Sequence, residues 1–126
     1  MARFFYDSYS VLAYLSDSPG YAAYFEQNTG VLTRLNLMEV YYAILRAHGT
    51  KAAHEVLEAY SAREIEFSLM DVEAAMKLRY ELRRLELSYA DALGYHIAKK
   101  EGLKFLTGDK AFEGLPGVEF VPLRKV

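Results

Sequence analysis

The sequence has no cysteine and no tryptophan among its 126 residues. Without cysteine, disulfides, thiolate metal sites and a cysteine nucleophile are all excluded. The same absence is compatible with a reducing cytoplasm, and we expect a cytoplasmic protein.

Long apolar runs and an excess of positive charge are also missing. No segment approaches the roughly 18 consecutive apolar residues of a membrane span, so we expect none. The start, MARFFYDSYSVLAYL, does not resemble a secretory signal, because Asp7 interrupts the apolar run and no small-residue cleavage site follows. The net charge of −2 argues against nucleic-acid binding through bulk charge. It argues less against a nuclease, because bound cations would change the local field.

The composition is that of an ordinary folded domain. Apolar residues make up 52% of the chain and charged residues 25%. This composition allows a substantial core and argues against intrinsic disorder. We find no internal repeat, linker or low-complexity run. The sequence therefore predicts a single domain over residues 1–126.

Short apolar segments alternate with helical patterns along the chain. The strands that we expect are at 3–7, 30–34, 64–68, 104–107 and 118–123. The helices that we expect are at 11–15, 21–27, 37–49 capped by Asn36, 50–63 capped by Thr50, 71–85 capped by Asp71, and 89–102 capped by Ser88. This alternation predicts an α/β three-layer sandwich, with a central, mainly parallel sheet flanked by helices.

Four acids from distant parts of the chain fall at one edge of such a sheet. Asp7 ends the first strand, and Asp109 follows the strand KFLT after one glycine. Glu39 and Asp91 lie in the first turns of helices, which start at the same edge. Ligands of parallel sheets bind outside the carboxyl ends of the strands. The topology therefore predicts that these four carboxylates converge.

Two interpretations of these acids remain open. Asn36 to Glu39 and Ser88 to Asp91 both have the capping-box spacing, and an acid in a first turn is favoured by the helix dipole. Asp109 lies in a common turn sequence, whereas capping gives no reason for Asp7. Crowded carboxylates repel one another, and a divalent cation such as Mg²⁺ would remove that penalty.

Other polar residues give weaker signals. The histidines have no metal-ligand spacing, and His48 and His54 are expected at the surface. The basic helix segment that contains Lys77, Arg83 and Arg84 is either a solvated face or a rim that holds phosphates. No Gly-rich phosphate loop is present, and no His–Asp pair accompanies the serines.

The chain resembles the PIN domain family, and within it the VapC-type toxins of toxin–antitoxin pairs. The matching segments, in order, are YDSYSVLAYL, LNLMEVYYAILRAHG, the helix around Lys77, and LSYADALGYHIAKKEGLKFLTGDKAF. They span nearly the whole chain in the family's order, and the last is the most specific.

The resemblance implies an endoribonuclease that depends on Mg²⁺ or Mn²⁺ and hydrolyses RNA. The family's four acids fall on Asp7, Glu39, Asp91 and Asp109, and its supporting hydroxyls fall on Ser8 and Thr107. The resemblance also implies a small antitoxin as partner and a homodimer.

Two other functions are compatible with the residues. One is a non-catalytic binding module that keeps the fold and uses the acids as caps. The other is an aspartate-based phosphatase with Asp7 as nucleophile. Tyr9 stands where phosphatases of the haloacid dehalogenase type carry a second aspartate, which argues against this function.

Overall fold

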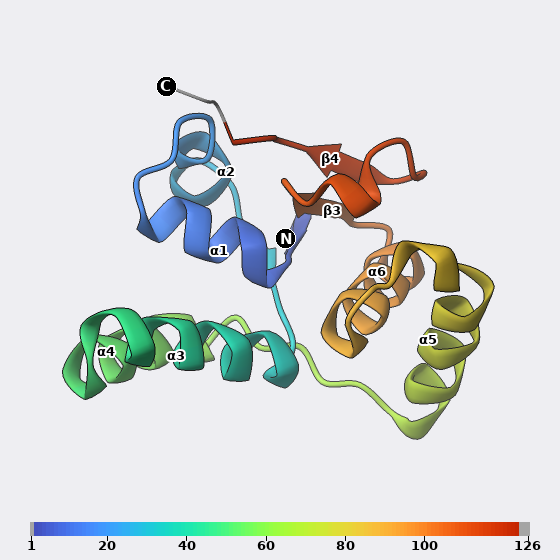
Figure 1. Ribbon diagram of the computed structural model, residues 1–126, viewed down its shortest axis with the longest axis horizontal. Helices are drawn as coiled ribbons and strands as arrows, with labels where there is room; N and C mark the ends of the chain where they lie inside the picture. The colour runs from blue at the N-terminus through green and yellow to red at the C-terminus, as the bar shows by residue number, and fades with distance from the viewer. Residues whose placement is uncertain (1, 124–126) are drawn as a thin grey trace.

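The structure is a computed structural model that describes residues 2–123. Its elements are β1 (Phe4–Tyr6), α1 (Ser8–Leu15), α2 (Ala22–Glu26), β2 (Gly30–Val31), α3 (Arg34–His48), α4 (Thr50–Ser61), α5 (Leu69–Glu81), η1 (Arg83–Leu85), α6 (Tyr89–Glu101), β3 (Lys104–Thr107), η2 (Lys110–Phe112) and β4 (Val118–Phe120), as labelled in part in Figure 1. None of the helices in this range has the length and apolar character needed to cross a bilayer.

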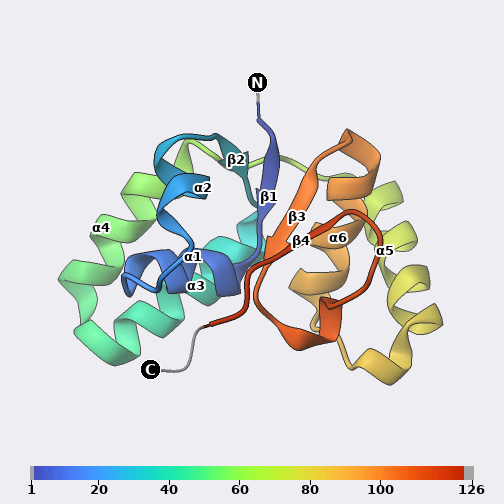
Figure 2. The ribbon, with the colours of Figure 1, turned by 90° about the horizontal axis from the view of Figure 1, so that it is seen from above.

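The four strands form one parallel sheet in the order β2-β1-β3-β4. Figure 2 shows α1 to α4 on one side of the central strands, and α5 and α6 on the other. The predicted three-layer α/β sandwich with a parallel sheet is confirmed. The connections from β1 to α1 and from β3 to η2 leave the sheet at the carboxyl ends of neighbouring strands.

Alternation along the central strands builds a core on each face of the sheet. Tyr6 and Leu106 pack with α1, α2 and α3 on one face. Phe5 and Phe105 pack with α6 on the other, with their ring centroids 5.7 Å apart. Full burial of one such apolar side chain contributes about 1.5–3 kcal/mol, so these strands are strongly held between the helical layers.

Gly94 brings α6 close against β1. A Cβ atom at this position would lie 2.5 Å from the Phe5 ring, which is too close for any side chain. Gly94 is less than one turn after Asp91 on α6, and Phe5 is two residues before Asp7. The close contact therefore fixes the start of α6 beside the end of β1.

Three predicted helix caps are wrong. The N-cap of α3 is Thr33, and Asn36 is the third helical residue, whose side chain completes the capping box. The residue before α4 is Gly49, so Thr50 is already helical. In α5 the cap is Ser68, and Asp71 is the third residue of its capping box. Helices α3 and α5 therefore start earlier than predicted, because the side chains of Asn36 and Asp71 bond back to the true cap from within the first turn.

Three other boundaries also differ from the prediction. The first helix starts at Ser8 rather than Val11, because Asp7 caps it. Helix α5 ends at Glu81, and the separate turn η1 covers Arg83–Leu85. The predicted strand at 64–68 is wrong: Leu32 and Glu64 form only an isolated bridge. Its neighbour β2 is two residues long, which leaves no strand for the segment to pair with.

Candidate functional site

Asp7 is buried at the carboxyl end of β1, with only 1% of its surface exposed. Its Oδ1 accepts a hydrogen bond of 2.7 Å from the backbone N–H of Ser10, so Asp7 is the N-cap of α1. Capping therefore does give a reason for this acid, contrary to the sequence interpretation. Capping does not account for its electrostatics. Burial raises the pKa of Asp7 to about 7, against the opposing effect of hydrogen bonds from Thr107 and Ser10.

Asp91 is half-buried in the first turn of α6. Its backbone N–H donates to Ser88 Oγ over 3.0 Å, and its Oδ2 accepts from the backbone N–H of Ser88 over 3.3 Å. Burial raises the pKa of Asp91, and the charges of Glu39 and Asp109 raise it further, although the capping bonds lower it. The predicted cap is confirmed, and the same carboxyl group also faces other acids.

Glu39 is exposed on α3 and is held by a chain of polar side chains. Ser8 Oγ donates to Glu39 Oε1 over 2.5 Å, and Asn36 Nδ2 donates to Ser8 Oγ over 3.1 Å. Asn36 is fully buried, and its Oδ1 accepts from the backbone N–H of Thr33 over 2.9 Å. This role of Asn36 was not predicted from the sequence, because its contact with Ser8 joins residues 28 positions apart.

Asp109 lies after β3, at the start of η2. Its Oδ1 accepts from the backbone N–H of Ala111 over 2.9 Å, and its own N–H donates to Thr107 Oγ1 over 3.0 Å. Gly108 makes this turn possible, because a Cβ there would lie 2.5 Å from the carbonyl oxygen of Val121. Burial raises the pKa of Tyr9, and the charges of Asp109 and Asp7 raise it further, so Tyr9 lies within electrostatic reach of both acids.

We call Asp7, Glu39, Asp91 and Asp109 the acidic edge. Asp91 is the common neighbour, since its charge raises the pKa of Asp7, and those of Glu39 and Asp109 raise its own. The four side chains interact through their charges but do not form a tight cluster. Among residues 2–123, no three Asp, Glu, His or Cys side chains stand close enough to hold one ion together.

The donor chemistry of the acidic edge fits a hard divalent cation. The groups that shift the pKa of Asp7 are hydroxyls, a backbone amide and another acid, and those that shift Asp91 are of the same kinds. The atoms available as metal ligands are oxygens, which Mg²⁺ prefers. Burial, and after it repulsion between the acids, raises both pKa values, and a cation would offset both effects. Since no three of these side chains converge on one point, one or two of Asp7, Glu39, Asp91 and Asp109 together with water would have to hold it.

The predicted basic residues lie on or after α5. Lys77 Nζ is 3.1 Å from Glu73 Oε1 on the same helix. The guanidinium carbon of Arg83 lies 4.5 Å from the centroid of the Tyr80 ring, and Arg84 is exposed in η1. The η1 turn leads through a short loop to the start of α6, so Arg83 and Arg84 belong to the end of the α5–α6 pair that carries Asp91.

The histidines lie away from the acidic edge. His48 and His54 are exposed, as predicted, and His54 pairs with Glu58 on α4. His96 instead contacts Asp71 in a second cluster of polar side chains. This cluster was not predicted from the sequence.

We call Ser68, Asp71, His96 and Lys100 the Asp71 cluster. Asp71 is 4% exposed, and its Oδ1 lies 2.9 Å from His96 Nε2 and 3.1 Å from Lys100 Nζ. Hydrogen bonds from the Ser68 backbone N–H and from His96 and Lys100 hold the pKa of Asp71 well below its usual range. The sequence signal was the spacing of four between His96 and Lys100, which places both on one face of α6.

Comparison with known proteins adds a family and a fold. The family model of the PIN domain matches residues 5–118. No curated protein matches the sequence of this chain.

Three solved structures share the fold over nearly their whole length. VapC20 of Mycobacterium tuberculosis, described as a toxin that cleaves the sarcin–ricin loop, is 18% identical, with a TM-score of 0.80 over 94% of this chain and 99% of that one. A toxin–antitoxin complex from Klebsiella pneumoniae is 21% identical, with a TM-score of 0.73 over 94% and 96%. VapBC2 of Rickettsia felis, bound to a DNA fragment from its promoter, is 20% identical, with a TM-score of 0.70 over 96% and 98%.

Proposed function

Because this chain belongs to the PIN domain family, we propose that it is a metal-dependent endoribonuclease that hydrolyses RNA phosphodiester bonds, and that it is the toxin of a toxin–antitoxin pair. The observation that best supports the proposal is Asp91, a half-buried capping acid that lies within electrostatic reach of Asp7, Glu39 and Asp109. A helix cap alone needs no acidic neighbours. The solved relatives support the toxin role, since one is described as a toxin that cleaves the sarcin–ricin loop, one as a toxin–antitoxin complex, and one as VapBC2 bound to promoter DNA.

The proposed mechanism assigns roles to the residues of the acidic edge. Asp7 and Asp109 would hold Mg²⁺ or Mn²⁺ directly, and Asp91 would hold it directly or through water. Glu39 would hold it through water or orient the nucleophilic water. A divalent cation bound there would lower the pKa of water and stabilise negative charge on the leaving oxygen.

Hydroxyl groups hold the acids in place. Ser8 donates to Glu39 and so fixes the direction of that carboxylate. Thr107 accepts from the backbone N–H of Asp109 and lowers the pKa of Asp7, so it links the two acids that end the central strands. We assign Ser8 and Thr107 to positioning.

The proposed partners follow from the same family assignment. The RNA backbone would contact the basic residues Lys77, Arg83 and Arg84, of which the last two lie toward the Asp91 end of α5 and α6. A small antitoxin would silence the enzyme, and the active form would be a homodimer in the cytoplasm.

Cleavage of a mixed-sequence single-stranded RNA tests the proposal. We would compare Mn²⁺, Mg²⁺ and EDTA, with Asp91→Asn as the matched variant, because asparagine keeps the shape and the capping oxygen and removes the charge. We expect cutting that needs metal and is lost in the variant. Equal cutting by both proteins would indicate a contaminating nuclease and would contradict the assignment of Asp91.

Two rival functions make different predictions. A non-catalytic binding module would show neither metal binding nor cleavage with any RNA. An aspartate-based phosphatase would form a covalent phosphoaspartate on Asp7, which can be trapped and detected by mass. Asp7 is buried and caps α1 through Oδ1, which argues against its use as a nucleophile.

A further inference from the structure

A small pocket adjoins the acidic edge between the starts of α3 and α6. It has a volume of about 230 Å³, and its lining residues are Leu35, Met38, Glu39, Tyr89 and Ala90. We call it the Tyr89 pocket. Glu39 belongs to the acidic edge, and Ala90 directly precedes Asp91. A ligand in this pocket would therefore lie next to the acids.

Tyr89 presents an exposed aromatic ring that is held from one side. The side chain is 64% exposed. The guanidinium carbon of Arg79 lies over the ring, 5.0 Å from its centroid. Arg79 is itself anchored, because its Nε donates to the backbone carbonyl of Leu87 over 2.8 Å, and Leu87 is buried. The arginine thus fixes the ring while leaving most of its surface open.

The shape and chemistry of the pocket suit one flat heterocycle. Its volume is below the roughly 300–1,000 Å³ of sites for drug-sized ligands, so it fits a ligand of one ring system. Leu35, Met38 and Ala90 supply apolar walls, and Glu39 supplies a hydrogen-bond acceptor. Single-stranded nucleic acids are commonly bound by stacking bases on aromatic rings, with arginine adding a cation–π contribution.

The charge of the chain makes such a contact useful. The protein has a net charge of −2, and the four acids of the acidic edge repel a phosphate backbone. Stacking does not depend on bulk charge, so it can hold RNA beside an acidic site where phosphate contacts are weak.

We propose that the Tyr89 pocket binds one nucleobase of the single-stranded RNA substrate, stacked on Tyr89, and so positions the neighbouring phosphodiester at the acidic edge. The inference rests on the proposed ribonuclease function and adds a base-binding subsite to it. Tyr89 is a positioning residue in this scheme, and Arg79 stabilises its ring.

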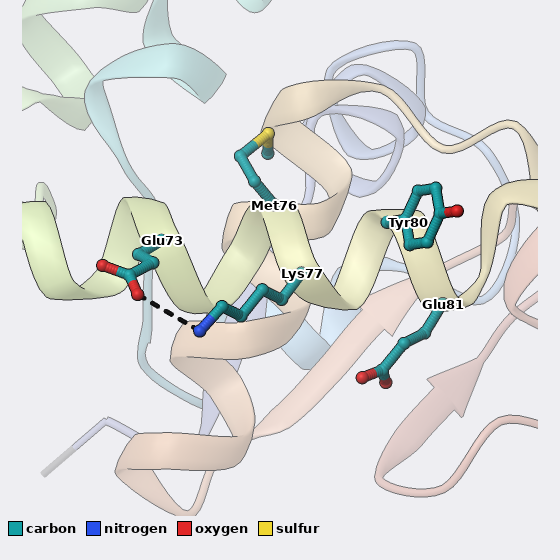
Figure 3. Close-up of a pocket in the computed structure, with 5 residues that line it drawn as sticks. All are labelled: Glu73, Met76, Lys77, Tyr80 and Glu81. Atoms are coloured by element: carbon teal, nitrogen blue, oxygen red, sulfur yellow. Dashed lines mark ion pairs between the residues drawn. The ribbon is translucent and has the colours of Figure 1, made fainter.

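Tyr42 on α3 provides a matched control outside the Tyr89 pocket. It is 60% exposed and also has an arginine over its ring, since the guanidinium carbon of Arg46 lies 5.5 Å from the centroid. Neither residue belongs to the acidic edge or to the proposed phosphate contacts. Tyr80, on α5 in the pocket that Figure 3 shows, is a poorer control, because it lines that pocket with Lys77 and contacts Arg83, two residues that we assign to the RNA backbone.

The test is the affinity for a fluorescein-labelled, mixed-sequence single-stranded RNA, measured by anisotropy in EDTA so that no cleavage is needed. Stacking on one ring contributes a free energy that corresponds to roughly 5- to 150-fold in affinity. We expect Tyr89→Ala to weaken binding by about that factor. Tyr89→Phe, which keeps the ring, and Tyr42→Ala should bind almost as wild type does.

An RNA with abasic sites separates stacking from a structural role. The wild type and Tyr89→Ala should bind this RNA equally, because it offers no base to stack. An equal loss on both RNAs would mean that Tyr89 supports the fold or the phosphate contacts, and would overturn the proposal. No difference between Tyr89→Ala, Tyr42→Ala and wild type on the normal RNA, or no binding by wild type, would also overturn it. The cleavage assay with Asp91→Asn decides the ribonuclease function separately.

Discussion

Helices α5 and α6 begin with the same motif and use it in opposite ways. Ser68 and Asp71 form a capping box at the start of α5, and Ser88 and Asp91 form one at the start of α6. Hydrogen bonds from the Ser68 backbone amide, the His96 imidazole and the Lys100 ammonium hold the pKa of Asp71 low. Burial and two other acids raise the pKa of Asp91. Two capping acids of the same spacing thus differ in their electrostatics according to what the fold packs against them.

The largest expected difference between the two acids is in catalysis. Asp91→Asn should lower RNA cleavage more than about 100-fold, beyond the range that changes to groups surrounding a metal site usually cost. Asp71→Asn should leave the cleavage rate within a few-fold of wild type, because the Asp71 cluster lies at the other end of α6. Single-turnover rates in Mn²⁺ measure both. A similar loss in the two variants would remove the distinction between the two regions.

The next largest effect is on the pH dependence of stability without metal. Asp7 has a pKa of about 7 in the folded protein against 3.8 as its model value, so the folded state holds its proton more tightly. The stabilisation that Asp7 contributes by holding its proton is complete below pH 4. It is lost as the pH rises to 7, and the free energy of unfolding falls by about 4 kcal/mol.

Asp71 has the opposite sign. Because its pKa is lowered, the charged form of Asp71 stabilises the fold above pH 4, and this stabilisation is lost as the pH falls below 4. Urea denaturation in EDTA from pH 3 to 8 measures both trends. Asp7→Asn, which keeps the capping oxygen, should remove the loss between pH 4 and 7. A wild-type profile that is flat over that range would contradict the burial account of Asp7.

Stability at pH 7.5 in EDTA should separate the acids more modestly. Asp71→Asn removes a charged acceptor from His96 and Lys100 and should lower the free energy of unfolding by about 2 kcal/mol. Asp91→Asn removes a repulsive charge and should leave that free energy unchanged or slightly raised. Urea denaturation of the two variants measures this contrast. The reverse ranking would show that Asp91 has attractive partners instead.

The smallest effect is the one that the two regions should share. Ser68→Ala and Ser88→Ala each remove one cap, because each hydroxyl accepts from the backbone N–H of its partner acid. Each should cost about 1 kcal/mol. Thermal denaturation in EDTA checks that the two losses are similar. Clearly unequal losses would mean that the caps differ locally as well as in their surroundings.

The sequence predicted the sheet-building parts of the fold because those signals are local. The strands at Phe4–Tyr6 and Lys104–Thr107 and the helix between Ser88 and Gly102 are short apolar segments or have clear end signals. The parallel order then placed four acids at one edge.

What the sequence did not predict depends on long-range contacts. Asp71 and Asp91 have the same local spacing, so their surroundings cannot be inferred from it. The role of Asn36 needs Ser8, which is 28 residues away. The segment 64–68 alternates like a strand, but its pairing depends on the length of β2.

The most direct test of the acidic edge as a divalent-cation site is a calorimetric titration of Mn²⁺ into the protein at pH 7.5. The variants Asp91→Asn and Asp71→Asn are titrated beside the wild type. We expect the wild type and Asp71→Asn to bind Mn²⁺ with similar affinity, and Asp91→Asn to bind it at least about tenfold more weakly. Equal binding by all three proteins, or none by the wild type, would contradict the assignment of the acidic edge as a divalent-cation site.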